Sequence, residues 1–225
     1  SGGYDGAPAR HVIAKFGGAL AMVLGKRVAP RVGTSVRIEV PEAGQSWTAQ
    51  IGEDGRAAFV DAIDEPTVVI TLSAEDFMVP SGSPGIDIYV RNKHPADMTR
   101  FSADRTLIYV HGATYPASTM FDLPLDGVSF MDELAAQGFD VYSIDLPGYG
   151  LSGAPAGRGF ARLDEMRDML ASFVREVIGR PALIVGNSMG GWLAVKLAWI
   201  APELVRGIVL MNAGGAPLDG RASWE

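Results

Sequence analysis

The chain has 225 residues, of which 48% are hydrophobic and 20% charged, a composition typical of globular proteins and sufficient for one large domain or two small ones. Its formal net charge of −7 argues against nucleic acid or an anionic membrane surface as a partner, because its long-range field repels phosphate. The absence of cysteine excludes disulfides, thiolate metal sites and a cysteine nucleophile, and leaves a reducing cytoplasm as the default compartment.

The two ends of the chain have features of an internal piece. Residues 1–6 contain neither an initiator methionine nor a basic region before an apolar core, so they are not a signal peptide. With the abrupt end at Glu225, this start predicts a fragment of a longer polypeptide. No run approaches the roughly 18 to 20 apolar residues that span a bilayer, so we expect a soluble chain without a membrane span.

Residues 10–79 have the pattern of a small α+β unit. Apolar residues recur every three or four positions over 11–28, which predicts a helix weakened by internal glycines. Three strand-like runs follow, at 36–40, 47–51 and 57–60. An Asp-Gly pair between the last two indicates a hairpin. A further strand over 67–72 precedes Ser73, where the sequence favours the capped start of a helix.

Residues 33–76 resemble the middle of a sterol-carrier-protein-2-like domain, through Trp47, the Asp-Gly turn and the closing Thr-Leu-Ser-Ala-Glu-Asp-Phe. The resemblance implies lipid carriage or an accessory role. The short version here lacks the sequence that would complete an apolar tunnel, so we favour a small packing or dimerisation domain and keep lipid binding as the alternative. His11 is expected at a helix end or on the surface.

Residues 80–85, Pro-Ser-Gly-Ser-Pro-Gly, are interpreted as a linker between an N-terminal domain (1–79) and a larger domain (86–225). Its two prolines can continue neither a helix nor a central strand. Because the segment is short, we expect the two domains to be in contact.

From residue 86 onward, strand and helix patterns alternate, which indicates a mostly parallel sheet covered by helices on both faces. Residues 86–90 alternate like a half-exposed edge strand, whereas 107–110 form a continuous apolar run like a buried parallel strand. Ser129 to Asp132 fits a capping box. The remaining expected elements are strands at 141–144, 182–185 and 208–211 and helices after 129, over 163–178 and over 192–200.

Gly186-Asn187-Ser188-Met189-Gly190 lies between an apolar run and helix-forming sequence, which predicts a strand, a sharp turn and a helix. Such a turn pushes the serine hydroxyl out of the sheet, and its glycines avoid collisions with neighbouring elements. The pentapeptide is a weak pattern in a chain with 28 glycines, so a glycine-rich turn with an inert serine is the alternative. The flanking strand and helix patterns favour Ser188 as a nucleophile.

Two further motifs follow predicted strands, at the edge where open α/β sheets bind ligands. They are His111-Gly112-Ala113-Thr114-Tyr115 and Asp145-Leu146-Pro147-Gly148-Tyr149-Gly150-Leu151-Ser152. With the serine motif third in order, they resemble the first half of the α/β-hydrolase fold family over about residues 86–215. The expected fold class is thus α/β, a partial α/β-hydrolase fold preceded by a small α+β domain. The resemblance implies Ser188 as the nucleophile and the backbone N–H groups of Met189 and Ala113 as oxyanion-hole donors.

His111 and Asp145 invite catalytic roles that we do not favour. In relatives the position of His111 shapes the oxyanion loop, so a role as general base is the lesser alternative. Asp145 could orient a histidine, but in its Asp-x-Pro-Gly context a carboxylate more often holds its own turn. Trp192 and Trp199, on the helix after the serine turn, are expected in the core rather than against a substrate.

The family's acid and histidine base follow the serine along the chain, and no histidine follows Ser188 here. Asp219 follows the last predicted strand too closely to match the acid. Without a base, a serine keeps its proton at neutral pH and is a poor nucleophile. We therefore expect the acid, the base and a lid to lie in a segment after Glu225, and this chain alone to be inactive.

The leading hypothesis is that the parent protein is a serine hydrolase that cleaves an ester or a similar acyl bond through an acyl-enzyme at Ser188. The hypothesis requires no metal or organic cofactor, and the expected partner is a small-molecule ester or acyl substrate. Two alternatives stay open. One is a non-catalytic module that binds a lipid or acyl chain, and the other is an acyltransferase on the same fold. Substrate identity and oligomeric state are left open.

Overall fold

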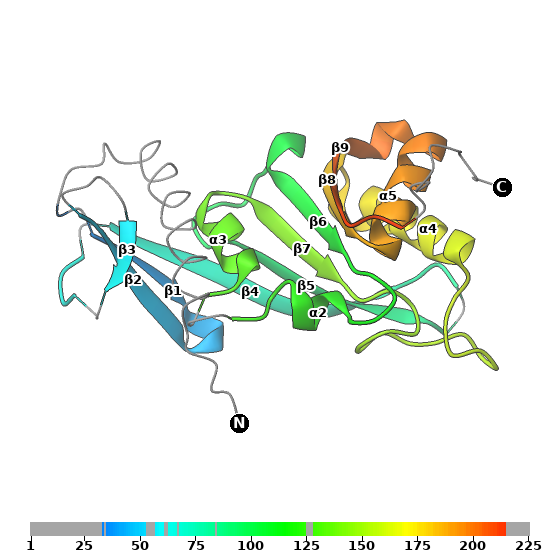
Figure 1. The fold of residues 1–225 in the computed structure, drawn as a ribbon, viewed down its shortest axis with the longest axis horizontal. Coiled ribbons are helices and arrows are strands. Elements are labelled where there is room, and N and C mark those ends of the chain that lie inside the picture. Colours follow the sequence, from blue (N-terminus) through cyan, green and yellow to red (C-terminus); the bar gives the residue numbers. More distant parts are fainter. Residues whose placement is uncertain are drawn as a thin grey trace, which may run out of the picture.

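The computed structural model describes residues 33, 35–52, 57–60, 63–66, 68–83, 85–124 and 128–214. These residues form one nine-stranded sheet with the order β3-β2-β1-β4-β5-β7-β6-β8-β9 (Figure 1). The helix predicted over 11–28 and the acid candidate Asp219 lie outside the described residues. Among the helices of the described part, none is long and apolar enough to cross a membrane.

The strands are β1 (Ser35–Val40), β2 (Gln45–Ile51), β3 (Ala57–Val60), β4 (Val68–Pro80), β5 (Asp87–Pro95), β6 (Thr106–Val110), β7 (Asp140–Ile144), β8 (Ala182–Asn187) and β9 (Val205–Met211). The helices are α2 (Ala117–Met120), α3 (Phe130–Ala136), α4 (Leu163–Ser172), its π-helical continuation (Phe173–Ile178) and α5 (Met189–Ile200). Short 3-10 turns lie at Pro41–Ala43, Ala103–Arg105 and Pro202–Leu204. Strands β6 to β9 are parallel to one another, whereas β5 is antiparallel to both of its neighbours, β4 and β7.

The sheet carries a hydrophobic core on each face. On β6, Leu107 and Tyr109 belong to the core that includes residues of α3, whereas Ile108 and Val110 belong to the core that includes residues of α4 and α5. All five residues of β6 are buried, so the strand is covered on both faces, as its continuous apolar run predicts. The predicted class, an α/β fold with a mostly parallel sheet covered by helices, is confirmed.

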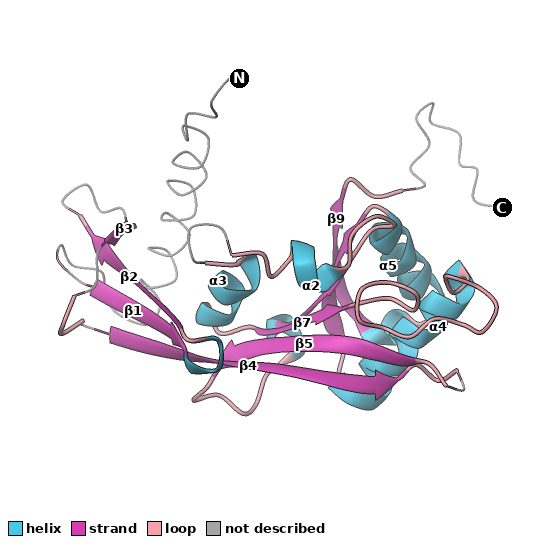
Figure 2. Ribbon diagram, turned by 90° about the horizontal axis from the view of Figure 1, so that it is seen from below, coloured by secondary structure: helices cyan, strands magenta, loops and turns pink. Residues whose placement is uncertain are grey.

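The largest departure from the sequence-based prediction lies in β4 and β5. The helix start predicted at Ser73 is wrong, because β4 continues through it and pairs with β5 from Leu72, opposite Pro95, to Pro80, opposite Asp87. This ladder overrides the local capping pattern of the sequence. Figure 2 shows the two strands as a long antiparallel pair that runs from the N-terminal strands towards α4.

Strand β5 is also not the half-exposed edge strand that its alternating sequence predicts. It lies between β4 and β7, and its residues Ile88, Tyr89 and Val90 are all buried. The alternation was misleading because β5 is paired on both edges and is buried at consecutive positions, so both of its faces are covered. On this strand Asn92 and Lys93 are buried together with the apolar residues.

Within the segment 80–85, interpreted from the sequence as a linker, Pro80 ends β4, and residues 81–83 and 85 lie between β4 and its antiparallel partner β5. The Ser81 N–H donates to the carbonyl of Ile86 at 2.9 Å, which closes the turn. At its other end β4 pairs in parallel with β1, where Val36 lies opposite Val68 and Glu39 opposite Thr71. Strands β1 to β3 therefore extend the same sheet. The division into two domains stays a prediction.

Several local predictions are confirmed. Strands β2 and β3 pair antiparallel, from Thr48 opposite Val60 to Ile51 opposite Ala57, as the Asp-Gly hairpin signal requires. Ser129 caps α3, with its hydroxyl accepting from the Asp132 N–H at 3.1 Å and the Asp132 carboxylate accepting from the Ser129 N–H at 2.9 Å. These contacts form the predicted capping box.

The two tryptophans of α5 differ. Trp192 packs partly buried against the core, but Trp199 is 85% exposed, so its prediction as a core residue is wrong. Trp199 lies on a part of α5 that no other described residue covers.

Candidate active site

Ser188 occupies a strained turn between β8 and α5. Its backbone has φ 49° and ψ −112°, and among the described residues only Asn212 shares a positive φ without being glycine. The turn is held from the side of β9, because the Ser188 N–H donates to the carbonyl of Met211 at 3.0 Å and the Gly214 N–H donates to the carbonyl of Ser188 at 2.8 Å. A residue other than glycine keeps a positive φ only where the surrounding structure imposes that conformation.

The glycines of the turn are required by close backbone contacts. A Cβ on Gly186 would lie 2.5 Å from the backbone nitrogen of Gly191, and a Cβ on Gly190 would lie 2.1 Å from the carbonyl oxygen of Val110. Neither clash can be relieved by a side-chain rotation, because both partners are backbone atoms. The collisions expected from the Gly-x-Ser-x-Gly pattern are therefore present.

The loop after β6 passes directly beside the serine. A Cβ on Gly112 would lie 3.1 Å from Cβ of Ser188, so Gly112 is in close contact with the turn, and the exposed Ala113 follows it. On the other side, Met189 is the first residue of α5, and the N–H groups of a first helical turn have no acceptor within the helix. The backbone segments that carry the two predicted oxyanion donors thus flank Ser188.

His111 is fully buried and uses both of its ring nitrogens. The Leu146 N–H donates to Nε2 at 2.9 Å, so Nε2 carries no proton, and Nδ1 donates its proton to the carbonyl of Gly112 at 2.5 Å. We assign this tautomer from the hydrogen bonds. Burial lowers the pKa of His111 below its usual 6.5. A neutral imidazole bound in this way orients the Gly112 loop and has no free nitrogen with which to act as a base.

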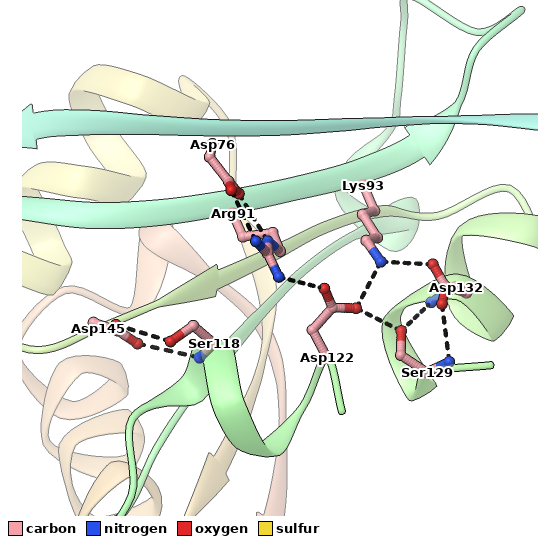
Figure 3. A network of polar contacts seen from close by, with 8 residues as sticks. All are labelled: Asp76, Arg91, Lys93, Ser118, Asp122, Ser129, Asp132 and Asp145. Atoms are coloured by element: carbon pink, nitrogen blue, oxygen red, sulfur yellow. Dashed lines mark hydrogen bonds and ion pairs between the residues drawn. The ribbon is translucent and has the colours of Figure 1, made fainter. Parts of the chain in front are cut away.

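Asp145 is fully buried and also holds backbone rather than a histidine. Its carboxylate accepts from the Ser118 N–H at 3.1 Å and the Ser118 hydroxyl at 3.0 Å (Figure 3). It also accepts from the Leu151 N–H at 3.1 Å. Gly150 lies against it, where a Cβ would come within 2.0 Å of Oδ2. Asp145 therefore holds its own turn, as expected, and ties that turn to α2.

Neither histidine in the described part of the chain is placed as a base for Ser188. His94 follows Lys93, which pairs with Val141 near the start of β7, so it lies at the opposite end of the parallel strands from Ser188. Its Nδ1 lies 2.9 Å from the carbonyl of Pro95. His11 lies outside the described residues. Within the described part, no group of three or more histidine, aspartate or glutamate side chains could hold a metal ion.

Sequence reasoning missed a group of charged residues between β5, α2 and α3. We call it the buried ion cluster, and it consists of Arg91, Lys93, Asp122, Ser129 and Asp132 (Figure 3). Lys93, with a side chain 5% exposed, donates at 2.7 Å to both Asp122 and Asp132. The cluster forms part of the lining of a cavity of about 350 Å³. The available signal was a pair of cations two positions apart, directly after the apolar run Ile88-Tyr89-Val90.

Two carboxyl groups next to this cluster have shifted pKa values in opposite directions. The hydrogen bonds from Arg91 hold the pKa of Asp76 below its usual value. Burial, together with the nearby charge of Asp132, raises the pKa of Glu133 to about 7. The Asp76 pKa is thus set mainly by its cationic partner, and the Glu133 pKa mainly by burial.

The family model described as alpha/beta hydrolase family matches residues 107–225, which is more than half of the chain. The chain belongs to the α/β-hydrolase family. The matched region contains the Gly112 loop, the Asp145 turn and the Ser188 turn, so the three motifs that flank the candidate site all fall within it.

Among curated relatives, the chain is 51% identical over 51 residues to the chloroplastic pheophytinase of Arabidopsis thaliana, a match over 23% of this chain and 10% of the relative. It is 42% identical over 89 residues to 2-hydroxy-6-oxononadienedioate/2-hydroxy-6-oxononatrienedioate hydrolase of Burkholderia vietnamiensis, over 39% of this chain and 30% of the relative. The chain thus spans less than a third of the length of these relatives.

Among solved structures, 2-hydroxy-6-oxo-6-phenylhexa-2,4-dienoate hydrolase from Rhodococcus sp. strain RHA1 matches with a TM-score of 0.52 at 22% identity, over 67% of this chain and 50% of that one. At this identity the likeness shows the fold alone.

Proposed function

We propose that the protein containing this chain is a serine hydrolase that cleaves an ester or a similar acyl bond, with Ser188 as its nucleophile. The observation that carries the proposal is the backbone of Ser188, φ 49° and ψ −112°, at the turn from β8 into α5. Turns of this kind expose a serine hydroxyl at the edge of an α/β sheet, and the strain persists here because Gly186 and Gly190 are in close backbone contact with neighbouring elements. Relatives named as hydrolases support the reaction class.

The chemistry follows from the position of the serine. Ser188 Oγ attacks the acyl carbon as a base takes its proton, and the carbonyl oxygen becomes an oxyanion. We assign its stabilisation to the backbone N–H groups of Met189 and Ala113, and one such donor contributes about 2.7 to 4 kcal/mol to lowering the barrier. The leaving alcohol departs with the proton, and water then attacks the acyl-enzyme, releasing the acid and restoring the Ser188 hydroxyl.

The base and its acid partner belong to the proposal as well. Both ring nitrogens of His111 are bound to backbone, and His94 lies at the far end of the strands. In the family order the acid and the histidine follow the serine, so we propose that both come from sequence downstream of Glu225. On this proposal residues 1–225 alone have no useful turnover.

The described residues give no support to the alternative of a lipid-binding module. The cavity of about 350 Å³ beside β4 and β5 is lined mainly by charged and polar side chains, including Glu42, Asp76, Arg91 and Lys93. Burying an acyl chain against charged and polar side chains is unfavourable, because it removes them from water without offering a hydrogen-bond partner. For residues 33–76, which resemble part of a sterol-carrier-protein-2-like domain, we therefore propose a packing or dimerisation role rather than lipid binding.

The test is labelling of the full-length parent with a fluorophosphonate probe, which reacts with activated serines. We expect stoichiometric labelling that is lost in Ser188→Ala and kept in Ser172→Ala, a control at a half-buried serine of α4. Labelling that survives Ser188→Ala would sink the proposal. Residues 1–225 alone should show no Ser188-dependent hydrolysis of simple esters, and turnover there would show that a base other than the proposed one exists.

A further inference from the structure

The segment that carries Ala113 has little regular structure of its own. After β6 it forms only the four-residue helix α2 before it reaches Asp122. A single helical turn is not stable in water, because its nucleation costs more than its hydrogen bonds return. Tyr115 is 61% exposed and Met120 is 42% exposed, so much of the segment does not pack against the core. Specific side-chain contacts must hold it in place.

The segment is held at several points along its length. Ser118 donates two hydrogen bonds to the Asp145 carboxylate. The ring of Phe121 stacks on the ring of Tyr109, with centroids 4.0 Å apart and 3° between the planes. The last anchor is Asp122, which ties the end of the segment to the sheet.

Asp122 makes three polar contacts from a side chain that is only 4% exposed. Its Oδ1 accepts from Lys93 Nζ at 2.7 Å and from Ser129 Oγ at 2.5 Å, and its Oδ2 accepts from Arg91 Nη1 at 2.8 Å (Figure 3). Arg91 and Lys93 belong to β5, which is paired on both edges. Charge-assisted hydrogen bonds are about twice as strong as neutral ones, so Asp122 joins α2 firmly to a rigid strand.

The charges of the cluster do not require Asp122 for neutralisation. Arg91 also donates two bonds to Asp76, at 2.7 and 2.8 Å, and Lys93 also donates to Asp132 at 2.7 Å. Two cations therefore face three carboxylates. Without the Asp122 charge, each cation would still keep a carboxylate partner. Of these three carboxylates, Asp122 is the one that binds both cations, whereas the 47% exposed Asp76 binds Arg91 and the buried Asp132 binds Lys93. Asp122 therefore links both cations to the end of the α2 segment in addition to balancing charge.

We propose that Asp122 is a positioning residue which, through Arg91 and Lys93, holds the Gly112–Ala113 turn against Ser188. It does not touch the reacting atoms and acts only through the backbone between Ala113 and α2. The anchoring stands by itself, and its consequence for catalysis rests on the proposed function of Ser188.

The anchoring is tested by amide hydrogen exchange on the full-length protein. In Asp122→Asn we expect exchange over residues 112–121 to rise on the order of tenfold, because the local opening free energy falls when a charge-assisted contact is lost. Peptides from β8 should keep wild-type rates. Asp76→Asn is the matched control, since it removes the other carboxylate partner of Arg91 without touching α2. It should leave residues 112–121 unchanged.

Wild-type exchange over 112–121 in Asp122→Asn, or equal acceleration in Asp76→Asn, would overturn the anchoring. A further variant, Arg91→Lys, keeps the test decisive if Asp122→Asn loses its structure as a whole. It keeps the positive charge, but one ammonium group cannot replace the guanidinium fork that binds Asp76 and Asp122 together. In Arg91→Lys the proposal requires faster amide exchange confined to residues 112–121, with a smaller increase than in Asp122→Asn. Unchanged exchange over these residues would also contradict the anchoring.

Catalysis supplies the second readout. In the parent enzyme, Asp122→Asn should lower kcat for an activated ester about tenfold and change KM less than about twofold, because the donor geometry matters in the transition state. An unchanged kcat with accelerated exchange would overturn the link to catalysis while leaving the anchor. Failure of the wild-type protein to react with a fluorophosphonate would instead defeat the proposed function, and the exchange data would still decide the anchoring.

Discussion

The two backbone segments beside Ser188 are built in different ways. The Met189 side is made by the chain itself, a strained turn whose glycines touch the backbone of Val110 and Gly191. The Ala113 side is an irregular segment held by side chains, through His111, Asp145 and the buried ion cluster. The segment of one proposed donor is therefore fixed by backbone packing, and the segment of the other by hydrogen bonds and charge.

This difference predicts different sensitivities. The first side should tolerate changes of side-chain charge and pH but no added Cβ atom, because its contacts are close and are made by backbone atoms that do not titrate. The second side should tolerate small changes of volume but respond to lost polar partners and to protonation. The predictions below test the contrast, beginning with the largest effect.

The largest effect is expected from adding a methyl group to the serine turn. In Gly190→Ala the new Cβ would meet the carbonyl oxygen of Val110 at 2.1 Å, so we expect a loss of about 3 kcal/mol or more in the free energy of unfolding. Urea denaturation measures it. Gly159→Ala, where a Cβ meets nothing within 4 Å, should stay within about 0.5 kcal/mol of wild type. Equal stability of the two variants would contradict the packing account of the turn.

An intermediate effect is expected at Asp145 on the other side. The Asp145 carboxylate accepts hydrogen bonds from Ser118 and Leu151, whereas in Asp145→Asn an amide N–H₂ group would face some of these donors. Because donors then face donors, we expect a loss of about 2 kcal/mol in the free energy of unfolding. Asp168→Asn is the control, because Asp168 has a side chain 63% exposed and pairs only with the neighbouring Arg167 among the contacts of the described residues. If both variants unfold at the same urea concentration, Asp145 does not hold the segment.

The smallest effect is a difference in pH dependence that arises from His111. Its pKa is lowered by burial in the folded state, so below about pH 6.5 the unfolded chain binds the proton and the folded chain does not. The contribution of the neutral His111 to the free energy of unfolding is therefore fully present above about pH 6.5 and is lost as the pH falls towards the folded-state pKa. The slope approaches about 1.4 kcal/mol per pH unit.

The variant His111→Gln lacks this contribution. The difference in free energy of unfolding between the wild type and the variant should therefore fall by about 1 kcal/mol per pH unit as the pH falls from 7 to 5. The raised pKa of Glu133, about 7, gives the opposite slope, but it is present in both proteins and cancels in the difference. Parallel pH profiles of the two proteins would show that His111 is not buried as a neutral ring.

The parts of the site made by local sequence were predictable. Gly186 and Gly190 mark a turn whose packing the pattern itself dictates, and the apolar run of β6 indicates a strand covered on both faces. The structural role of Asp145 follows from its turn sequence, and the hydrogen bonds to Leu151 agree with it. In each case the residue pattern itself specifies the local conformation, even where, as for Gly190 and Val110, the partner lies far away in the sequence.

The parts made by distant residues were not predictable. The signal for a helix at Ser73 is overridden by pairing with β5, whose partner residues come later in the chain. Asp122 meets Arg91 and Lys93 only because α2 folds back over β5. Trp199 is a large apolar residue of the kind expected in a core, but its side chain is exposed in the described part of the chain. No local pattern encodes these contacts.

The most direct test of the central claim is to trap the acyl-enzyme in the full-length parent. A rapid acid quench during hydrolysis of an activated acetyl ester, followed by mass spectrometry of the peptides, should find one acetyl group on Ser188 and none in Ser188→Ala. An acetyl group on a different residue, or hydrolysis at the wild-type rate in Ser188→Ala, would contradict the account.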